Sequence, residues 1–230
     1  MSKGLFVSAT GTDVGKTYVT ALLVKKLVQS GLAAGYYKAA LSGAECQNGQ
    51  LVPGDADYVR RVAGLKQTYS EMVSYVYENA VSPHLAARLE QLPVELSRIK
   101  KDFYSVAAAY DYVTMEGSGG IVCPIRYDEE QQLFLADIIQ TLRLPVLLVA
   151  DAGLGTLNSV VTTCEYMQNH NLPLAGIILN NYDENQFMHR DNRLMIERLT
   201  GRPPLAVVAP GCTDLALAAA DLAALYREID

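Results

Sequence analysis

The chain has 230 residues, of which 50% are hydrophobic and 19% charged, and its formal net charge is −6 at pH 7. This length and hydrophobic content suffice for the core of one α/β domain, so we expect residues 1–230 to form a single domain. The acidic balance, with no basic run longer than Lys100-Lys101, argues against a nucleic-acid-binding surface.

Membrane and extracellular classes are also disfavoured. No stretch approaches the roughly 18 apolar residues of a membrane span, and the N-terminus lacks the long apolar core of a signal peptide. Cys46, Cys123, Cys164 and Cys212 lie far apart and form no C-x-x-C pair. This spacing favours reduced cysteines over a zinc site or a disulfide framework, so we expect a cytoplasmic protein.

The most informative stretch is residues 4–17, an apolar run that leads into a glycine-rich turn ending in Gly15-Lys16-Thr17. It predicts a strand, a phosphate-binding loop and the start of a helix that ends near Gly31. A helix N-terminus presents unpaired backbone N–H groups and a partial positive charge, both of which suit phosphate groups. We therefore expect Lys16 to contact the β- and γ-phosphates of a nucleotide, and Thr17 to offer its hydroxyl to Mg²⁺.

Residues 33–40 are predicted to form a second strand, which places Lys38 near its carboxyl end and Ser42 just beyond it. Open parallel sheets bind ligands at this edge. A loop rich in Gly, Asn and Gln follows, and Asp55 and Asp57 then open a short helix. Because Asp is a good N-cap, one of these two carboxylates has a purely structural explanation.

The middle of the chain gives weaker signals. Residues 69–77 are rich in Tyr, Val and Ser and suggest an edge strand. A helix is expected to begin at Ser82, with Pro83 in its first turn, and a second helical run covers residues 94–110. His84 is interpreted as a structural residue in preference to a substrate contact, because a lone His near a helix start is more often structural.

Residues 112–116 form a predicted strand that ends in Glu116 and runs directly into Gly117-Ser-Gly-Gly120. A carboxylate at the end of an apolar strand is costly to bury without a cation or a donor, so Glu116 is expected to face a metal or a ligand. The glycines allow the backbone to approach that ligand closely. A helix is predicted over residues 133–142.

Three more apolar strands are expected, each followed by polar or turn residues, with Thr156 or Asn158 capping or lining the helix after the first of them. The strands cover residues 145–151, 174–181 and 205–211, and helices cover residues 186–199 and 214–228. Alternation of strands and helices along the whole chain predicts an α/β fold, with a mostly parallel sheet covered by helices on both faces. Candidate polar groups fall at the carboxyl ends of these strands: Lys16, Lys38, Glu116, Asn158 and Asn180.

Several short motifs occur in order along the chain, and their combination is more specific than any one of them. They are Gly11-Thr-Asp-Val-Gly-Lys-Thr17, Tyr37-Lys38 with Ser42-Gly43, Gly54-Asp55-Ala56, Ser82-Pro83-His84, Glu116-Gly-Ser-Gly-Gly120, Leu154-Gly-Thr-Leu-Asn158 and Asn180. In this order they resemble the dethiobiotin synthetases, a family of the P-loop NTPase class. The resemblance implies ATP-dependent closure of a cyclic urea from CO₂ and 7,8-diaminononanoate, giving dethiobiotin, ADP and phosphate.

The resemblance also implies roles for individual residues. Lys16 would neutralise the transferring phosphate, and Lys38 would hold the anionic carbamate beside it, with Thr12 as a further catalytic residue. Mg²⁺ would be held by the hard oxygen ligands of Thr17, Asp55 and Glu116.

The remaining implied contacts divide between nucleotide and substrate. Asn158 would bind the tail carboxylate of the diamine at a homodimer interface, and Asn180 would contact the adenine edge. The substrate set implied by the resemblance is Ser42, Gly119 and Asn158. The nucleotide set is Asp13, Val14, Gly15, Lys16, Thr17, Tyr18, Asp55, Glu116, Gly117, Ser118, Gly119, Asn180, Asn181 and Pro210.

The chain departs from the family pattern at a few positions. Ala9 stands where the family often has Gly, Ala39 stands where it often has Pro, and Thr10 replaces the first glycine of the usual phosphate-loop pattern. Neither Ala9 nor Ala39 touches a group that does chemistry. The segment expected to contact the nucleotide base is the least clear match, and only Pro210 and its neighbours are assigned to it.

Two other functions are compatible with a phosphate-binding loop. Switch proteins of the ParA and MinD type carry a signature lysine at the position of Gly11, and this chain also lacks a basic patch for DNA and an amphipathic C-terminal membrane helix. Amidoligases of the cobyrinic-acid type normally add a glutaminase domain, for which 230 residues leave no room. A non-catalytic relic is disfavoured because Lys38, Asp55 and Glu116 also match.

Overall fold

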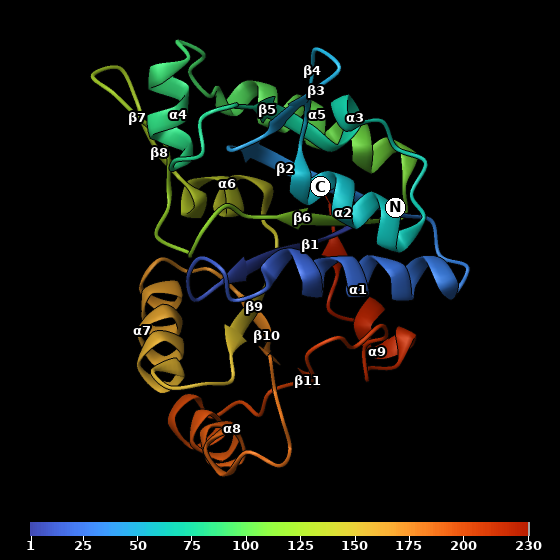
Figure 1. Ribbon diagram of the computed structural model, residues 1–230, viewed down its shortest axis with the longest axis vertical. Coiled ribbons are helices and arrows are strands. Elements are labelled where there is room, and N and C mark those ends of the chain that lie inside the picture. Colours follow the sequence, from blue (N-terminus) through green and yellow to red (C-terminus); the bar gives the residue numbers. More distant parts are fainter. Residues whose placement is uncertain (230) are drawn as a thin grey trace.

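The computed structural model describes residues 1–229 and has a central, mostly parallel sheet in the order β11-β10-β9-β1-β6-β2-β5, with β12 antiparallel to β1 (Figure 1). The strands of this sheet are β1 (Lys3–Ala9), β2 (Ala34–Leu41), β5 (Val73–Val76), β6 (Tyr112–Glu116), β9 (Val146–Asp151), β10 (Leu174–Asn180), β11 (Ala206–Val208) and β12 (Arg227–Glu228). Two hairpins lie outside it: β3 (Glu45–Gln47) with β4 (Gln50–Val52), and β7 (Pro124–Tyr127) with β8 (Gln132–Phe134).

Helices cover both faces of the sheet, which confirms the predicted α/β fold class (Figure 1). They are α1 (Lys16–Gln29), α2 (Gly54–Ala63), α3 (Tyr69–Met72), α4 (Pro83–Leu89), α5 (Leu96–Ala109), α6 (Leu135–Leu142), α7 (Thr156–Asn169), α8 (Phe187–Thr200) and α9 (Ala219–Ala223). Among residues 1–229, no helix has both the length and the apolar character to cross a membrane.

Strand β2 shows how the sequence divides the core into two layers. All eight of its residues are buried, as expected for an inner strand of a parallel sheet. Because side chains alternate along a strand, Tyr36 packs into the core beneath α1 and α2, whereas Tyr37 packs into the core on the opposite face with α5 and α6. Both tyrosine side chains are fully buried.

The strand register brings two of the predicted site residues together. In the parallel ladders around β6, Glu116 lies opposite Val7 of β1 on one side and Lys38 of β2 on the other. Parallel strands end at the same edge of a sheet, so this register puts Lys38 and Glu116 beside the turn that follows β1. The carboxyl edge lies toward the left of Figure 1.

Most predicted elements are present with small shifts of their ends, but the predicted helix over residues 214–228 is wrong. Only α9 is helical there, and Arg227–Glu228 instead forms strand β12 on the edge of β1. The start of the segment is tied to α1, because Lys25 Nζ donates to the Thr213 carbonyl at 2.8 Å and Lys26 Nζ donates to Asp214 Oδ2 at 2.8 Å. These tertiary contacts outweigh the helix propensity of an Ala- and Leu-rich sequence.

Three smaller expectations also need correction. The edge strand predicted over residues 69–77 is only β5, because the first four residues form α3, which carries a capping box. Asp55 is not an N-cap: Pro53 occupies that position, and Asp55 lies in the first turn of α2. Gly155 precedes α7 as its N-cap, so Thr156 and Asn158 are in the first turn of that helix.

Candidate active site

The turn between β1 and α1 has the shape that a phosphate-binding loop requires. Gly15 has φ +86°, and a Cβ added there would lie 2.0 Å from the Asn180 amide nitrogen, so only glycine fits. That amide nitrogen donates to the Val14 carbonyl at 3.0 Å. The end of β10 is thereby packed against the loop at the N-terminus of α1.

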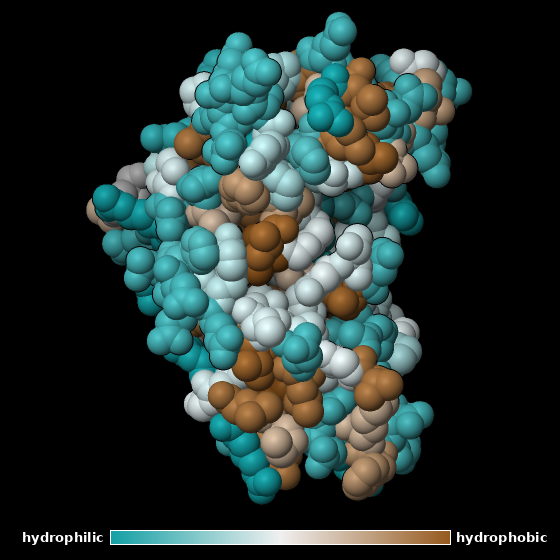
Figure 2. All heavy atoms as spheres, turned by 90° about the vertical axis from the view of Figure 1, so that its left-hand side faces the viewer, coloured by the Kyte–Doolittle hydropathy of each residue, from teal (hydrophilic) through white to brown (hydrophobic). Residues whose placement is uncertain are grey.

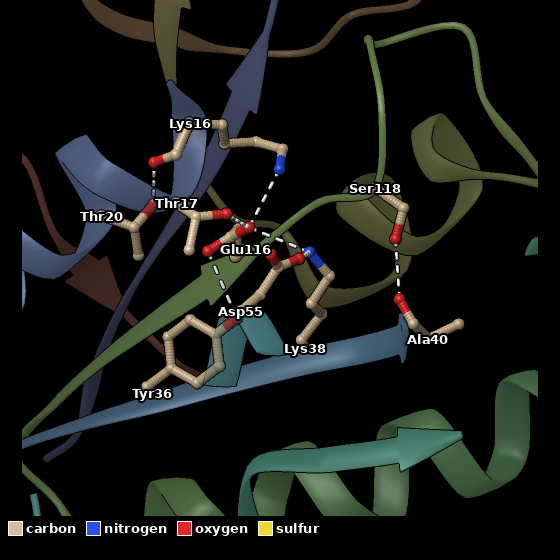
Figure 3. Close-up of polar contacts among 9 residues, drawn as sticks. All are labelled: Lys16, Thr17, Thr20, Tyr36, Lys38, Ala40, Asp55, Glu116 and Ser118. Carbon is tan, nitrogen blue, oxygen red and sulfur yellow. Dashed lines mark hydrogen bonds and ion pairs between the residues drawn. The ribbon is translucent and has the colours of Figure 1, made fainter. Parts of the chain in front are cut away.

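Glu116 is the centre of a buried cluster of charges at this edge (Figure 3). Its Oε1 oxygen accepts hydrogen bonds from Lys16 Nζ at 2.9 Å and from Thr17 Oγ1 at 2.8 Å. Lys38 Nζ donates to the same oxygen at 2.9 Å and to Asp55 Oδ2 at 2.5 Å. The structure thus brings together five residues that the sequence had predicted from four separate segments.

Burial and charge act in opposite directions on the pKa of Glu116. Burial would raise it, but the positive charges of Lys16 and Lys38 and their hydrogen bonds outweigh burial and lower the pKa from 4.5 to about 2. The carboxylate therefore stays ionised at neutral pH.

The two lysines share this carboxylate, yet their pKa values move in opposite directions. Burial, the largest influence, and the nearby positive charge of Lys38 lower the pKa of Lys16, against the opposing effects of Glu116 and Asp55. Burial also acts to lower the pKa of Lys38, but Glu116 and Asp55 together raise it well above its ordinary value. The difference follows from the number of carboxylates in contact, which is one for Lys16 and two for Lys38.

A cavity of about 1030 Å³ opens above this cluster. Figure 2 looks onto this edge of the molecule and shows a hollow there, with a largely hydrophilic rim. The volume is at the upper end of ligand pockets, enough for a nucleotide and a second substrate. The predicted site residues that line it are Thr12, Asp13, Gly15, Lys16, Thr17, Tyr18, Lys38, Ser42, Asp55, Ser118 and Gly119.

Other predicted residues do not line this cavity. Glu116 is buried beneath the cavity, in contact with Lys16 and Lys38, which do line it. Asn181 donates to Asp151 Oδ2 at 2.7 Å, and both Asn158 and Pro210 are exposed to solvent. Val14, Gly117 and Asn180 are also absent from the cavity wall, although Asn180 contacts the loop from behind. His84 lines a separate, smaller cavity of about 140 Å³ between α4 and β7.

The sequence analysis missed the apolar part of the wall. Leu41, Val81, Val122 and Cys123 line the same cavity as the charged residues. Leu41 follows Lys38 at the end of β2, and the other three residues flank motifs identified in the sequence. Their closeness in sequence to those motifs was the signal that could have predicted their place in the cavity wall. A cavity lined by both apolar side chains and two ammonium groups suits a substrate that joins an alkyl chain to an anionic head.

It also missed Tyr36, whose hydroxyl donates to the second oxygen of Glu116, Oε2, at 3.2 Å. Burial, and then the nearby charge of Glu116, raise the pKa of Tyr36 well above 10, so the hydroxyl is a neutral donor. The alternation that puts Tyr36 and Lys38 on one face of β2 was the signal for this residue.

The sequence of most of this chain is similar to those of known proteins. A family model described as "AAA domain" matches residues 3–212. An ATP-dependent dethiobiotin synthetase BioD from Clostridium botulinum (strain Alaska E43 / Type E3) is 50% identical over 203 residues, covering 88% of this chain and 89% of the relative. Another from Brachyspira hyodysenteriae is 49% identical over 215 residues, covering 94% of this chain and 96% of the relative.

The chain belongs to the ATP-dependent dethiobiotin synthetase family.

Solved structures that resemble this dethiobiotin synthetase family member show its fold at much lower identity. A ParA family ATPase from Chlorobium tepidum TLS has a TM-score of 0.55 and 15% identity, covering 91% of this chain and 85% of that one. MinD in the MinC:MinD complex of Aquifex aeolicus has a TM-score of 0.56 and 12% identity, covering 90% of this chain and 81% of that one. At such identity the likeness establishes the P-loop NTPase fold and carries no argument about activity.

Proposed function

We propose that this chain is an ATP-dependent ligase that carboxylates 7,8-diaminononanoate with CO₂ and closes the ring of dethiobiotin, releasing ADP and phosphate. One observation carries the proposal. Lys16, at the end of the phosphate-binding loop, and Lys38, on strand β2, both form an ion pair with the buried carboxylate of Glu116 at the floor of a large cavity. Two cations aimed at one place suit a reaction in which a phosphate and a second anion must approach each other.

The chemistry proceeds in three steps. One amine of the diamine adds to the carbon of CO₂ and loses a proton, which gives a carbamate. A carbamate oxygen attacks the γ-phosphorus of ATP, ADP leaves, and a carbamic-phosphoric mixed anhydride forms. The other amine then attacks the carbonyl carbon and loses a proton, phosphate leaves with the bonding pair of the anhydride, and the cyclic urea closes.

Each lysine has a separate task in this scheme. Lys16, at the start of α1, neutralises the charge on the transferring phosphate. Lys38, held between Glu116 and Asp55, binds the carbamate and keeps it in line with that phosphate. Thr12 lines the same cavity and contacts the carbamate or the amine.

The donors around Glu116 fit Mg²⁺. Glu116, Asp55 and Thr17 supply two carboxylates and a hydroxyl, the hard oxygen ligands that this ion prefers. Within residues 1–229, no group of three or more His, Cys, Asp or Glu side chains is arranged to hold a metal ion. This is consistent with Mg²⁺ bound by one or two carboxylates together with the phosphates of ATP. When bound, the ion supplies charge neutralisation at those phosphates.

The remaining contacts surround the two substrates. We propose that Asn180 contacts the adenine edge, and that Ser42 and Gly119, which line the cavity, bind the diamine. The rest of the nucleotide set follows the ATP from loop to base: Asp13, Val14, Gly15, Tyr18, Gly117, Ser118, Asn181 and Pro210.

The position of Asn158 leads us to propose a homodimer. Asn158 is exposed on the first turn of α7 and lies outside the cavity of its own chain, so a substrate tail in that cavity reaches the Asn158 of a second copy. Leu154, just before α7, is 93% exposed and offers apolar area that a second copy could cover. Hydrophobic residues gather in and below the hollow on the face drawn in Figure 2.

We also propose that residues 1–230 form one domain that works in the cytoplasm. In support of one domain, β12 near the C-terminus pairs with β1 near the N-terminus. In support of the compartment, all four cysteines are free thiols, the state that a reducing environment maintains.

The sharpest test of this chemistry follows an oxygen atom. Bicarbonate labelled with heavy oxygen is supplied with the diamine and Mg-ATP, and the released phosphate is analysed by mass spectrometry. Because a carbamate oxygen attacks the γ-phosphorus, one labelled oxygen is expected in the phosphate. Phosphate without label, formed at the same rate, would contradict the carbamate route.

A further inference from the structure

Glu116 is held from two sides that differ in kind. The donors on its Oε1 oxygen, Lys16, Thr17 and Lys38, all line the cavity. On the other side, its Oε2 oxygen accepts a hydrogen bond from the Tyr36 hydroxyl (Figure 3). Tyr36 is fully buried and does not line the cavity.

The backbone of Tyr36 is fixed by an unusual contact. Strand β2 pairs with β5 only from Lys38 onward, so one edge of β2 at Tyr36 has no neighbouring strand. The side chain of Gln67 takes that place: the Tyr36 N–H donates to Gln67 Oε1 at 2.8 Å, and Gln67 Nε2 donates to the Tyr36 carbonyl at 3.1 Å. Gln67 is itself only 2% exposed. Tyr36 is therefore held by hydrogen bonds at both its backbone and its hydroxyl group.

In the proposed function, the two lysines that donate to Glu116 from the cavity side also bind the substrates. In the proposed reaction, Lys16 binds the transferring phosphate and Lys38 binds the carbamate, so both hydrogen bonds that these lysines donate to Glu116 Oε1 would be given up. Tyr36 donates only to Glu116, and its ring is packed in the core beneath α1 and α2. Its hydrogen bond to Glu116 Oε2 therefore comes from a residue that has no part in binding the substrates.

We propose that Tyr36 is a positioning residue for Glu116: its hydroxyl holds Oε2, so that Oε1 stays directed at the Mg²⁺ of the bound nucleotide while both lysines transfer to the substrates. This inference rests on the proposed role of Glu116 as a Mg²⁺ ligand. Partners of metal ligands commonly contribute a factor of about 10 to 100 in metal affinity.

Tyr36→Phe tests the proposal, and the chain supplies a matched control in the next residue. Tyr37 is on the same strand and equally buried, but its hydroxyl contacts Ser74 and the Ile99 carbonyl on the opposite face of the sheet. Both substitutions remove one hydroxyl from a buried ring. Calorimetric titration measures ADP affinity over a series of Mg²⁺ concentrations, and once more with EDTA.

For Tyr36→Phe, the Mg²⁺ concentration that gives half-maximal enhancement of ADP binding is expected to rise about tenfold. ADP affinity in EDTA is expected to stay within twofold of the unmodified chain, because the loop and Lys16 are untouched. Tyr37→Phe is expected to change neither quantity by more than twofold. A loss of stability alone would lower both affinities together.

Equal Mg²⁺ dependence in the two variants would overturn the role of Tyr36 and leave the proposed function standing. If the unmodified chain bound ADP with no Mg²⁺ dependence, the Mg²⁺ role of Glu116 and this inference would fail together. Should Tyr36→Phe not fold, Gln67→Met keeps the phenol but releases its backbone, and a rise of two- to fivefold in the same Mg²⁺ concentration is expected. An unchanged value for Gln67→Met would then overturn the inference.

Discussion

At the scale of single residues, the site depends on one carboxylate that balances two ammonium groups. Glu116 is 1% exposed and Lys38 is 3% exposed, so neither charge is stabilised by bulk water. Removing one partner of such a buried cluster is costly, because the remaining charges lose their compensation. In the proposed reaction, phosphate and carbamate oxygens replace those contacts.

Lys38→Ala is expected to lower kcat for phosphate release by about a hundredfold or more, because the carbamate loses the charge that orients it. Binding of Mg-ATP is expected to change by less than about threefold, since Lys16 and the loop remain. Steady-state phosphate release and calorimetric ATP titration measure the two effects. Lys101→Ala, an exposed lysine on α5, serves as the control. A Lys38→Ala variant with normal turnover is incompatible with the proposed mechanism.

The pKa of Glu116 makes stability depend on pH. Since its pKa is about 2 in the folded protein and 4.5 in its ordinary state, the unfolded chain takes up the proton first as pH falls. The contribution is complete above pH 4.5 and is lost toward pH 2, by up to about 3 kcal/mol. Urea unfolding over this range is expected to show a shallower acid decline for Glu116→Gln than for the unmodified chain. Parallel declines would show that Glu116 is not a stabilised carboxylate.

At the scale of elements, patterns local in sequence predicted the strands well, and contacts distant in sequence explain the failures. Hydrophobicity located β1, β9 and β10, because each of these strands is a largely continuous apolar run. The segment after β11 was mistaken for a long helix, since neither its anchoring to α1 nor the pairing of β12 with β1 is visible in its composition. Pairing register is likewise a property of the sheet, not of one strand.

The same limit applies to the site. Lys38 and Glu116 were predictable because polar groups at the ends of parallel strands meet at one edge. Tyr36 was missed: alternation places it on the same face of β2 as Lys38, but only the register shows that its hydroxyl reaches Glu116. The apolar wall at Val81 and Val122 comes from loops, whose folded position the sequence pattern does not specify.

The loop before α1 gives a prediction at this scale. Gly15→Ala is expected to lower stability by at least about 1 kcal/mol and to weaken ATP binding, because φ is +86° and the new methyl group would overlap Asn180. Gly11→Ala is the control, since a Cβ there meets no atom within 4 Å, and its stability is expected to change by less than about 0.5 kcal/mol. Thermal unfolding and ATP titration give both values. Equal behaviour of the two variants would refute the assigned loop geometry.

At the scale of the whole molecule, the proposed contact between Asn158 and the substrate requires a second copy of the chain. The cavity holds the phosphate-binding loop, both lysines and an apolar wall, but no described residue of α7 lines it. A second copy would supply the missing polar contact and cover Leu154. Catalysis and association are therefore expected to depend on the same surface.

Light scattering after size exclusion is expected to give a mass near twice the 25.0 kDa of one chain. Leu154→Asp is expected to shift the mass toward 25.0 kDa and to raise KM for the diamine, because a charge replaces the exposed leucine. Leu199→Asp, at the far end of α8 and 53% exposed, is the control and is expected to remain dimeric. A dimeric and fully active Leu154→Asp variant would remove the support for this interface.

The central claim is that this site joins CO₂ to a vicinal diamine at the expense of ATP. The most direct measurement supplies the purified chain with 7,8-diaminononanoate, heavy-carbon bicarbonate, ATP and Mg²⁺, and follows the products by mass spectrometry. A cyclic urea that carries the heavy carbon, formed in equal amount with phosphate, is the predicted result. Phosphate released without that urea, or only with another diamine or acid, would contradict the claim.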